Sequence, residues 1–450
     1  MTFKRALGPF DATMLVVGAI IGAGIFINPS IVAARLPGGG AVITAWVLGG
    51  AVALAGAFAY AELGSIFPRV GGQYAYLRDA YHPLAGFLYG WALLTTIESG
   101  ALAAVAITFA QYTLRLVGRP DAAATPLAVT AIVVVSAVNY LGVKPGSRLL
   151  NVFVVLKILA LAVLILAGLV IPAPVHDETV RQAALPIAAL PLAFGAALVP
   201  ILFAYGGWQN ANYVAEEIHD ASRTLPRALL AGTTLVVIVY VAVNVTYLRA
   251  LGAAGLAGTL TPAADTAGLI LGRGGDRFVA AAIAISTFGF LDLGVLAPTR
   301  VYYAMAADGA FLPAVARLHP RFRTPSLAIV IQSTWCVILT LTGTYGDLLD
   351  SVVFADWIFF GLTVAALFVF RRRVPPASRP AGSYLTPGYP LLPAAFVIVA
   401  AGVVLSVIIT APARSAMGVA VLAVGVPVYY AFRRQAADRE PSPQTPSAER

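Results

Sequence analysis

The chain has 450 residues, of which 60% are hydrophobic and 11% are charged, and its formal net charge is +9. Soluble domains contain roughly 45–50% apolar and 25% charged residues, so this composition excludes an ordinary water-soluble domain and indicates an integral membrane protein. The single cysteine, Cys336, excludes a disulfide within the chain and gives no basis for a metal or thiol site, so we expect neither metal nor cofactor.

Twelve apolar stretches are near or above the length of about 20 residues that a helix needs to cross a hydrocarbon core of about 30 Å. They lie at residues 11–35, 41–67, 84–117, 127–143, 149–171, 190–217, 228–247, 278–306, 327–341, 348–370, 391–410 and 416–432. The first stretch is too long for a cleavable signal and no small-residue cleavage site follows it, so we expect it to remain as the first span.

Glycine interrupts the first and sixth stretches near their middles, at Gly22-Ala23-Gly24 and at Gly206-Gly207. Unwound backbone in lipid leaves amide and carbonyl groups without partners, so a break persists only where it lines a cavity or contacts a ligand. The alternative is glycine that merely allows close helix packing. Because each break is followed by a second half-helix that ends in polar residues, we favour a binding site between two halves of the chain.

Four charged side chains lie at membrane depth elsewhere, namely Glu98, Lys157, Asp292 and Asp356. A mid-helix lysine costs ~2.5–3.5 kcal/mol on insertion scales, so Lys157 needs either compensating carbonyl groups or a route for its ammonium to the inner leaflet. Glu98 is a candidate proton site, and a pair with another side chain explains it equally well. Asp292 lies roughly 240° around its helix from Ser286, so we interpret it as a packing or gate residue.

The basic residues are distributed unevenly between the two sides of the predicted membrane topology. The side opposite the N-terminus holds only Arg35, Arg115, Arg119, Arg181, Arg249, Arg273, Arg277 and Arg414. The positive-inside rule therefore places both termini in the cytoplasm, and an even number of spans agrees. Residues 433–450 are rich in Pro, Ser, Gln and charge, which predicts a disordered cytoplasmic tail. We expect the lipid bilayer, and not nucleic acid, to be the partner of this basic chain.

The motifs around the breaks resemble those of a known family. Gly18-Ala-Ile-Ile-Gly-Ala-Gly-Ile-Phe26 and Phe203-Ala-Tyr-Gly-Gly-Trp208, with Glu216-Glu217 closing the helix, are similar to the L-type amino acid transporter branch of the amino acid/polyamine/organocation superfamily. The resemblance extends over most of the chain, including Tyr60-Ala-Glu-Leu-Gly64 with Gly71-Gly-Gln-Tyr-Ala-Tyr76, and Arg300 to Gly309 followed by His319-Pro320.

This resemblance implies an all-α integral membrane fold with twelve transmembrane helices. Two inverted repeats of five spans, arranged as in leucine transporters, would occupy residues 1–171 and 188–371. Two extra C-terminal helices would occupy residues 389–432, before the tail.

The resemblance also implies that both breaks bind an amino acid through their main chains. The expected substrate-binding residues are Ile20, Ile21, Gly22, Ala23, Gly24, Phe203, Ala204 and Gly206. The amides of Ala23 and Gly24 would bind the carboxylate at the start of a half-helix, and carbonyl groups on the first and sixth spans would accept the ammonium. Ala23 stands where many relatives have serine, so only its amide is expected to contribute. Phe203 matches an aromatic gate on the outer side, the alternative being a lipid-facing or core phenylalanine.

In sodium-independent members of this fold, a lysine on the fifth span stands where sodium-coupled members bind an ion. Lys157 falls at the matching position, and Ser286 and Thr287 on the eighth span are the partners expected to complete this substitute for a sodium site. Glu216 and Glu217, beside Arg223 and Arg227 in the sequence, are interpreted either as an inner-gate or structural ion-pair group or as solvated charges.

The leading hypothesis is sodium-independent secondary transport of amino acids, expected to be neutral, by alternating access through exchange or proton symport. A carrier of cationic amino acids or polyamines is the alternative within the fold, and Glu98 is the residue that would face such a substrate. A membrane-embedded enzyme is a remote alternative, because no histidine dyad and no Gly-x-Ser-x-Gly motif is present. We expect a multi-pass protein of the cell membrane, and the sequence specifies no oligomeric state.

Overall fold

The structure is a computed structural model that describes residues 5, 7–141, 146–171, 186, 189–272, 274–322, 324–343 and 345–437. The regular elements in these ranges are helices, and the one extended pair among them is the bridge between Leu7 and Ile218. Ten helical segments in the same ranges are long and apolar enough to cross a membrane. The prediction of an all-helical, multi-pass membrane protein is therefore confirmed.

The first part of the chain forms a broken helix followed by four further membrane-length segments. Its elements are α1 (Pro9–Ile20), α2 (Gly24–Arg35), α3 (Gly38–Ile66), α4 (Gln73–Ala80), α5 (Pro83–Ala92), the π-helical turn η1 (Leu93–Ile97), α6 (Glu98–Leu116), the 3-10 turn η2 (Asp121–Ala123), α7 (Ala124–Leu141) and α8 (Gly146–Val170). The segment Pro83–Leu116 is long and apolar enough to be one membrane span, and it includes the π-helical turn.

The second part also begins with an interrupted helix. Its elements are α9 (Leu190–Tyr205), α10 (Asn210–Tyr213), the 3-10 turn η4 (Ala215–Glu217), α11 (Ala221–Ala257), α12 (Pro262–Leu271), α13 (Gly275–Leu296), α14 (Thr299–Ala307), η5 (Pro313–Ala316), α15 (Ser326–Thr342), α16 (Tyr345–Arg373), η6 (Pro376–Ser378), α17 (Leu391–Thr410) and α18 (Pro412–Ala437). α9 and α15 are apolar but shorter than the ten membrane-length segments.

Several element boundaries differ from those predicted. Two short helices, α4 and α12, lie in segments that we predicted as connections. The eighth span is divided between α13 and α14 at Pro298, which lacks an amide hydrogen and restricts the residue before it. α18 continues to Ala437, so residues 433–437 of the predicted disordered tail are helical. Other predicted features lie outside the described residues: positions 142–143 and 188, Arg181, Arg273 and residues 438–450.

Aromatic side chains fill the core on both sides of the second interrupted helix. Trp46 of α3 packs edge-on against Tyr205 and Tyr240, with ring centroids 5.7 and 5.8 Å away. Beyond the break, Trp208 stacks on Phe360 at 4.9 Å and is buried. Trp208 is therefore a packing residue beside the second break.

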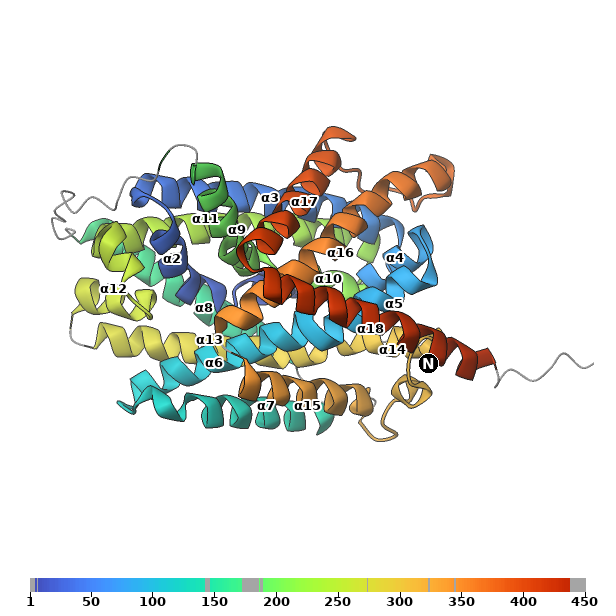
Figure 1. Cartoon of the computed structure of the whole chain (residues 1–450), viewed down its shortest axis with the longest axis horizontal. Helices are drawn as coiled ribbons and strands as arrows, with labels where there is room; N and C mark the ends of the chain where they lie inside the picture. Colours follow the sequence, from blue (N-terminus) through green and yellow to red (C-terminus); the bar gives the residue numbers. More distant parts are fainter. Residues whose placement is uncertain are drawn as a thin grey trace, which may run out of the picture.

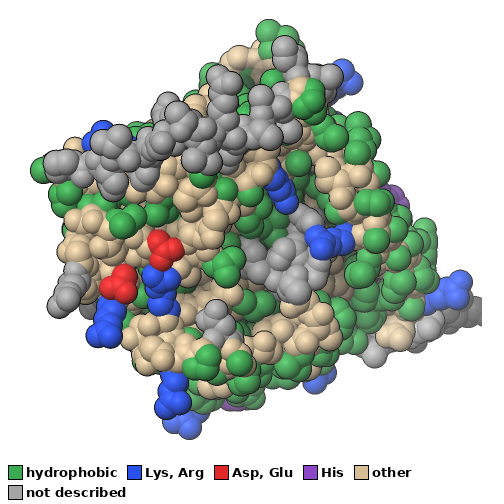
Figure 2. All heavy atoms as spheres, turned by 60° about the vertical axis from the view of Figure 1, so that its left-hand side comes forward, with side chains coloured by type: hydrophobic (Ala, Val, Ile, Leu, Met, Phe, Trp, Pro, Cys, Tyr) green, Lys and Arg blue, Asp and Glu red, His purple; other side chains and the backbone are tan. Residues whose placement is uncertain are grey.

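The outer surface of the helix bundle is strongly apolar. α7 and α15 form one edge of the bundle beside α6 and α13 (Figure 1). Large exposed apolar side chains lie on α7, α8 and α17, among them Val134, Leu159, Leu166 and Ile398. Figure 2 shows a face with abundant hydrophobic atoms and few acidic side chains. Such a surface is an aggregation hazard in water but is what a lipid-facing helix requires.

Glu216 and Glu217 do not pair with the arginines that follow them in the sequence. Glu217 forms an ion pair with Arg300 of α14 at 3.1 Å, and the carboxylate of Glu216 accepts a hydrogen bond from the amide of Val70 at 3.1 Å. The sequence neighbours Arg223 and Arg227 lie at the start of α11 instead. The two glutamates therefore connect the end of the sixth span to other elements, which supports the ion-pair interpretation.

Candidate functional site

The first interruption lies between α1 and α2. α1 ends at Ile20, Ile21 leaves helical geometry with φ −76° and ψ 80°, and α2 begins at Gly24. The Gly22 amide folds back and donates to the carbonyl of Ile20 at 2.8 Å. The amides of Ala23 and Gly24 stand at the start of α2, where a helix supplies no internal acceptors for its first N–H groups. This end of α2 therefore carries a partial positive charge.

The second interruption follows α9. The helix ends at Tyr205, Gly206 is extended with φ −67° and ψ 164°, and Gly207 has a φ of +111°. Residues with a Cβ atom rarely adopt that φ, so glycine is required at position 207. The Gly207 amide donates to the side-chain oxygen of Gln209 at 2.9 Å, and the helix resumes as α10.

The two breaks are in direct contact with each other. A Cβ atom on Gly24 would lie 2.5 Å from the Cα atom of Ala204, and one on Gly207 would lie 2.2 Å from the carbonyl oxygen of Ala19. Both distances are shorter than a side chain allows. Glycine therefore permits the crossing of the two unwound segments, in addition to the unwinding itself.

Tyr240 of α11 joins the two breaks, and we did not predict its role from the sequence. Its hydroxyl group lies 3.0 Å from the carbonyl oxygen of Ile20 and 3.2 Å from that of Ala204. The side chain is fully buried. A buried tyrosine hydroxyl generally needs a hydrogen-bond partner, so a tyrosine within an apolar span is the signal that could have indicated such a contact.

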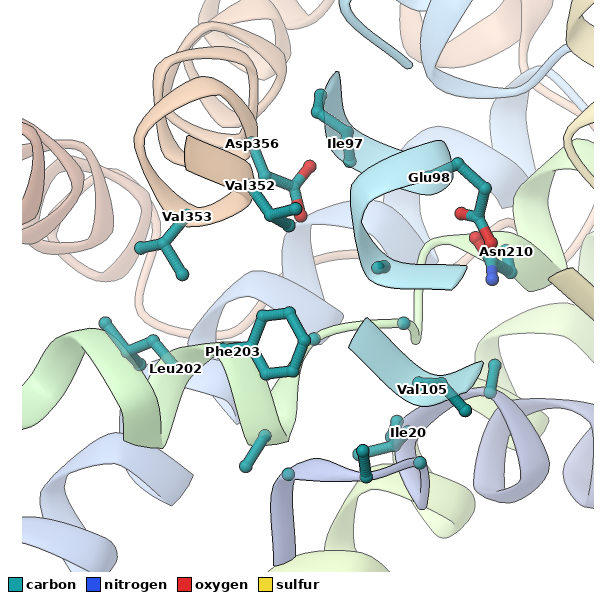
Figure 3. Close-up of a pocket in the computed structure, with 18 of the residues that line it drawn as sticks. Ile20, Ile97, Glu98, Val105, Leu202, Phe203, Asn210, Val352, Val353 and Asp356 are labelled. Atoms are coloured by element: carbon teal, nitrogen blue, oxygen red, sulfur yellow. The ribbon is translucent and has the colours of Figure 1, made fainter. Parts of the chain in front are cut away.

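A cavity of about 60 Å³ lies where the breaks cross. On this measure one water needs roughly 10–15 Å³, so the cavity has room for a small polar molecule or several waters. Seven of the eight predicted substrate-binding residues line it: Ile20, Gly22, Ala23, Gly24, Phe203, Ala204 and Gly206. Figure 3 shows Phe203 projecting from α9 between Ile20 and the side chains of α16. The predicted residue Ile21 is not part of the lining.

Contact with Lys157 of α8 accounts for the absence of Ile21 from the cavity lining. Its ammonium group donates to the carbonyl oxygen of Ile21 at 2.9 Å and to that of Gly18 at 3.4 Å. Only 3% of the residue is exposed. The carbonyl group of Ile21, which we expected to face a substrate, is therefore engaged by a protein side chain. Of the two environments that we considered, the structure contains the carbonyl partners and not a lysine extended to the membrane surface.

Ser286 and Thr287 of α13 are buried, but neither forms a hydrogen bond with Lys157 in the described structure. The Thr287 hydroxyl lies within hydrogen-bond distance of the carbonyl groups of Ile283 (2.8 Å) and Ala284 (3.1 Å) on its own helix. Serine and threonine in helices commonly bond to the preceding turn in this way. The Ser286 hydroxyl has no protein partner among the described residues.

Two carboxyl groups line the same cavity, Glu98 at the start of α6 and Asp356 in α16. One carboxyl oxygen of each is buried and has no hydrogen-bond partner in the described structure. From the sequence we placed Asp356 at membrane depth but not at the site. By contrast, Asp292 lies outside the cavity lining, and its carboxylate accepts a hydrogen bond from Asn139 of α7 at 2.7 Å, as a packing residue would.

The described residues contain no group of three or more His, Cys, Asp and Glu side chains that would hold a metal ion. The cavity walls otherwise consist of apolar side chains and amides, including Gln209 and Asn210. The polar features of this site are thus the main-chain groups at two helix breaks, two carboxyl groups and the side-chain amides of Gln209 and Asn210. Such an arrangement can bind a small molecule with charges of both signs.

Comparison with known proteins identifies related sequences over nearly the whole chain. The amino acid permease family matches residues 7–432. The large neutral amino acids transporter small subunit 2 of Oryctolagus cuniculus is 30% identical over 437 residues, which cover 96% of this chain and 81% of the relative. The serine/threonine exchanger SteT of Bacillus subtilis (strain 168) is 30% identical over 437 residues, covering 96% and 98%. The Asc-type amino acid transporter 1 of Homo sapiens is 30% identical, covering 96% and 82%.

Proposed function

Because this chain belongs to the amino acid permease family, we propose that it is a sodium-independent secondary transporter of neutral amino acids. The names of the relatives point the same way, since they include a serine/threonine exchanger and a large neutral amino acids transporter subunit. Transport proceeds by alternating access, as exchange of one amino acid for another or as symport with a proton. The protein is not an enzyme.

The observation that carries this proposal is the meeting of two helix breaks at one cavity. An amino acid is a zwitterion, and the breaks offer a complement to each of its charges. The carboxylate binds the amides of Ala23 and Gly24 at the positive end of α2. The ammonium binds carbonyl groups at the ends of α1 and α9, where Ile20 and Ala204 line the cavity, and it would share these carbonyl groups with the Tyr240 hydroxyl that already lies beside them. Phe203 covers the substrate as the outer gate.

Lys157 takes the place of a sodium ion in this proposal. An ammonium group with three donors can gather carbonyl groups at a helix break much as a cation does. The distances of 2.9 and 3.4 Å to the carbonyl oxygens of Ile21 and Gly18 support that role. Because the positive charge is covalently attached, transport needs no external sodium.

The proposed topology has twelve spans, with α9 and α15 counted as short spans. Residues 1–171 and 188–371 form the two inverted repeats, and residues 389–432 form two additional spans. Five spans per repeat reverse the direction of the second repeat, which allows the two halves to open alternately to either side. The protein resides in the cell membrane with both termini in the cytoplasm, in accordance with its basic residues.

The proposal is tested by uptake into proteoliposomes that contain the purified full-length protein. A panel of labelled amino acids is supplied while external sodium, the proton gradient and internal amino acid are varied separately. We expect uptake of small neutral amino acids without sodium, stimulated by internal amino acid or by an inward proton gradient. Strict sodium dependence would overturn the role of Lys157, and equal uptake of substrates with a blocked carboxylate or ammonium would overturn the role of the breaks.

A further inference from the structure

A groove of about 400 Å³ lies between α7 and α15, at the edge of the helix bundle where these two helices lie side by side (Figure 1). Its floor contains the buried hydroxyl groups of Ser136 and Ser333, which lie 2.6 Å apart and hydrogen-bond to each other. Because this polar pair is satisfied within the protein, the groove needs no polar ligand along its length. Apolar side chains form its walls: Val133, Ala137, Leu141, Ile329, Val330 and Val337. The groove therefore suits an apolar chain.

Tyr140, in the last turn of α7, lines one end of this groove and contacts the loop that precedes α15. The carbonyl group of Tyr140 accepts a hydrogen bond from the Thr324 hydroxyl at 3.1 Å. Its ring packs edge-on against His319, with ring centroids 5.7 Å apart. The Nδ1 atom of His319 in turn accepts hydrogen bonds from the amides of Arg321 and Phe322, at 3.3 and 3.2 Å. These contacts hold the loop at the mouth of the groove.

The loop is basic and has no acidic residue near it in the sequence. Arg317, Arg321 and Arg323 lie in it, whereas residues 309–346 and 122–176 contain no Asp or Glu. Arg317 and Arg321 are exposed, and neither forms an ion pair with a described carboxylate. The positive-inside rule accounts for arginines on this side of the membrane, but it does not place them at the end of an apolar groove. An apolar groove with positive charge at its mouth is complementary to an anionic amphiphile.

We propose that this groove binds an anionic phospholipid of the cytoplasmic leaflet. One acyl chain lies along the apolar walls, and the phosphate group binds the guanidinium groups of Arg317 and Arg321. Basic sites between transmembrane helices on the cytoplasmic side hold anionic head groups, and a guanidinium group matches the geometry of a phosphate. The bound lipid connects α7 to the start of α15 and stabilises their packing. This inference goes beyond the transport function and does not depend on the identity of the substrate.

The test compares dioleoyl phosphatidylglycerol with dioleoyl phosphatidylcholine, because the two lipids share their acyl chains and only the first carries a net negative charge. Each lipid is titrated into the purified full-length protein after removal of native lipid in detergent. The melting temperature reports binding, and native mass spectrometry counts the lipid molecules that stay bound. Glycerol 3-phosphate, which supplies the phosphate group without acyl chains, separates a lipid from a soluble anion.

Two pairs of variants address the head group and the acyl chain separately. Arg317→Gln with Arg321→Gln removes the charge at the mouth of the groove. Its control is Arg433→Gln with Arg434→Gln, which removes the same charge from exposed positions at the end of α18. Ala137→Phe fills the groove, whereas Val138→Phe places the same ring at the next position of α7, which is exposed but outside the groove lining.

We expect phosphatidylglycerol to stabilise the wild type more than phosphatidylcholine does, and glycerol 3-phosphate to have no effect. Loss of both loop arginines should weaken phosphatidylglycerol binding by about tenfold or more, because each basic residue near the membrane surface adds to the attraction. Ala137→Phe should weaken it as well, and both controls should bind as the wild type does. Equal stabilisation by the two lipids, or equal loss in the two arginine pairs, would overturn the proposal. Unchanged lipid affinity in Ala137→Phe would overturn it too, as would stabilisation by glycerol 3-phosphate alone.

Discussion

Lys157 fixes the conformation of the first break through two contacts of a single charged group. Its ammonium donates to the carbonyl groups of Ile21 and Gly18. Replacing lysine by methionine keeps the length of the side chain but removes all donors. Hydrogen bonds to charged groups contribute about 1.5–3 kcal/mol, so we expect Lys157→Met to reduce initial uptake rates by about tenfold or more. Initial rates in proteoliposomes measure the effect.

Ser286→Ala provides the control for this prediction. The Ser286 hydroxyl is buried on α13 and makes no hydrogen bond to Lys157 in the described structure. We therefore expect its loss to change uptake less than about twofold, since a hydroxyl without a partner contributes no hydrogen-bond energy. A loss as large as that of Lys157→Met would show that the hydroxyl belongs to the lysine site. Poor expression of Lys157→Met, with normal transport by the protein that does fold, would make the lysine merely structural.

Tyr240→Phe tests the connection between the two breaks. The substitution removes the hydroxyl that lies 3.0 Å from the Ile20 carbonyl and 3.2 Å from the Ala204 carbonyl, but keeps the ring beside Trp46. A hydrogen bond contributes about 0.5–1.5 kcal/mol, so we expect a two- to tenfold rise in the KM for substrate with small loss of thermal stability. Unchanged kinetics would show that packing alone aligns the breaks.

Which contacts of the site could be predicted from the sequence depended on the chemistry of each residue. Lysine at membrane depth must find acceptors, and the broken helix was the evident source, so the Lys157 contacts follow from the sequence. The hydroxyl of Thr287 had an alternative in its own helix, and that local bond is invisible in the residue pattern. Tyr240 and Asp356 reach the site only through the packing of α11 and α16, which one sequence does not specify.

At the scale of elements, the crossing of the two unwound segments depends on glycine at both positions. Alanine at position 24 would press its Cβ against Ala204, and alanine at 207 would meet the carbonyl of Ala19 while holding a φ of +111°. The opposing atoms are main chain, which cannot rotate away. We expect Gly24→Ala and Gly207→Ala to abolish uptake and to lower the melting temperature of the purified protein.

Gly402→Ala is the matched substitution for these two. Gly402 lies in the middle of α17, and a Cβ atom there would meet nothing within 4 Å. Because alanine is favoured over glycine inside a helix by roughly 0.5–1 kcal/mol, this variant should transport normally and be at least as stable as the wild type. Normal transport by Gly24→Ala would instead show that the breaks separate without loss of function.

Helices and helix breaks could be predicted from the sequence where a local pattern of residues marks them. Apolar length located the membrane helices, and paired glycines located the points at which α1 and α9 end. The short helices α4 and α12 were not predicted, because a helix of 8 or 10 residues is too short to stand out as an apolar stretch of membrane length. The π-helical turn at Leu93–Ile97 was not predicted either, since its sequence, Leu-Leu-Thr-Thr-Ile, has no pattern that separates it from the α-helices on either side.

At the scale of the whole molecule, one buried ion-pair group links segments far apart in the chain. Glu62 at the end of α3 is fully buried and accepts hydrogen bonds from Arg371 of α16 at 2.8 and 2.7 Å. The amide of Thr386 donates to the same carboxylate at 2.8 Å, and Arg379 lies 3.7 Å from it. Glu62 therefore joins α3, α16 and the connection that leads to α17.

Removing the charge of Glu62 leaves two arginines around a neutral, buried amide. Breaking a buried pair in this way costs about 3–5 kcal/mol, so we expect Glu62→Gln to lower the melting temperature markedly and to reduce the yield of monodisperse protein. Arg69→Ala is the control, because the Arg69–Asp79 pair is 3.7 Å long and the arginine side chain is 62% exposed. An exposed pair contributes about 0–1 kcal/mol, so its loss should leave stability nearly unchanged. Equal stability of both variants would mean that hydrophobic packing alone holds α3 against α16, and that the acid at position 62 is dispensable for the fold.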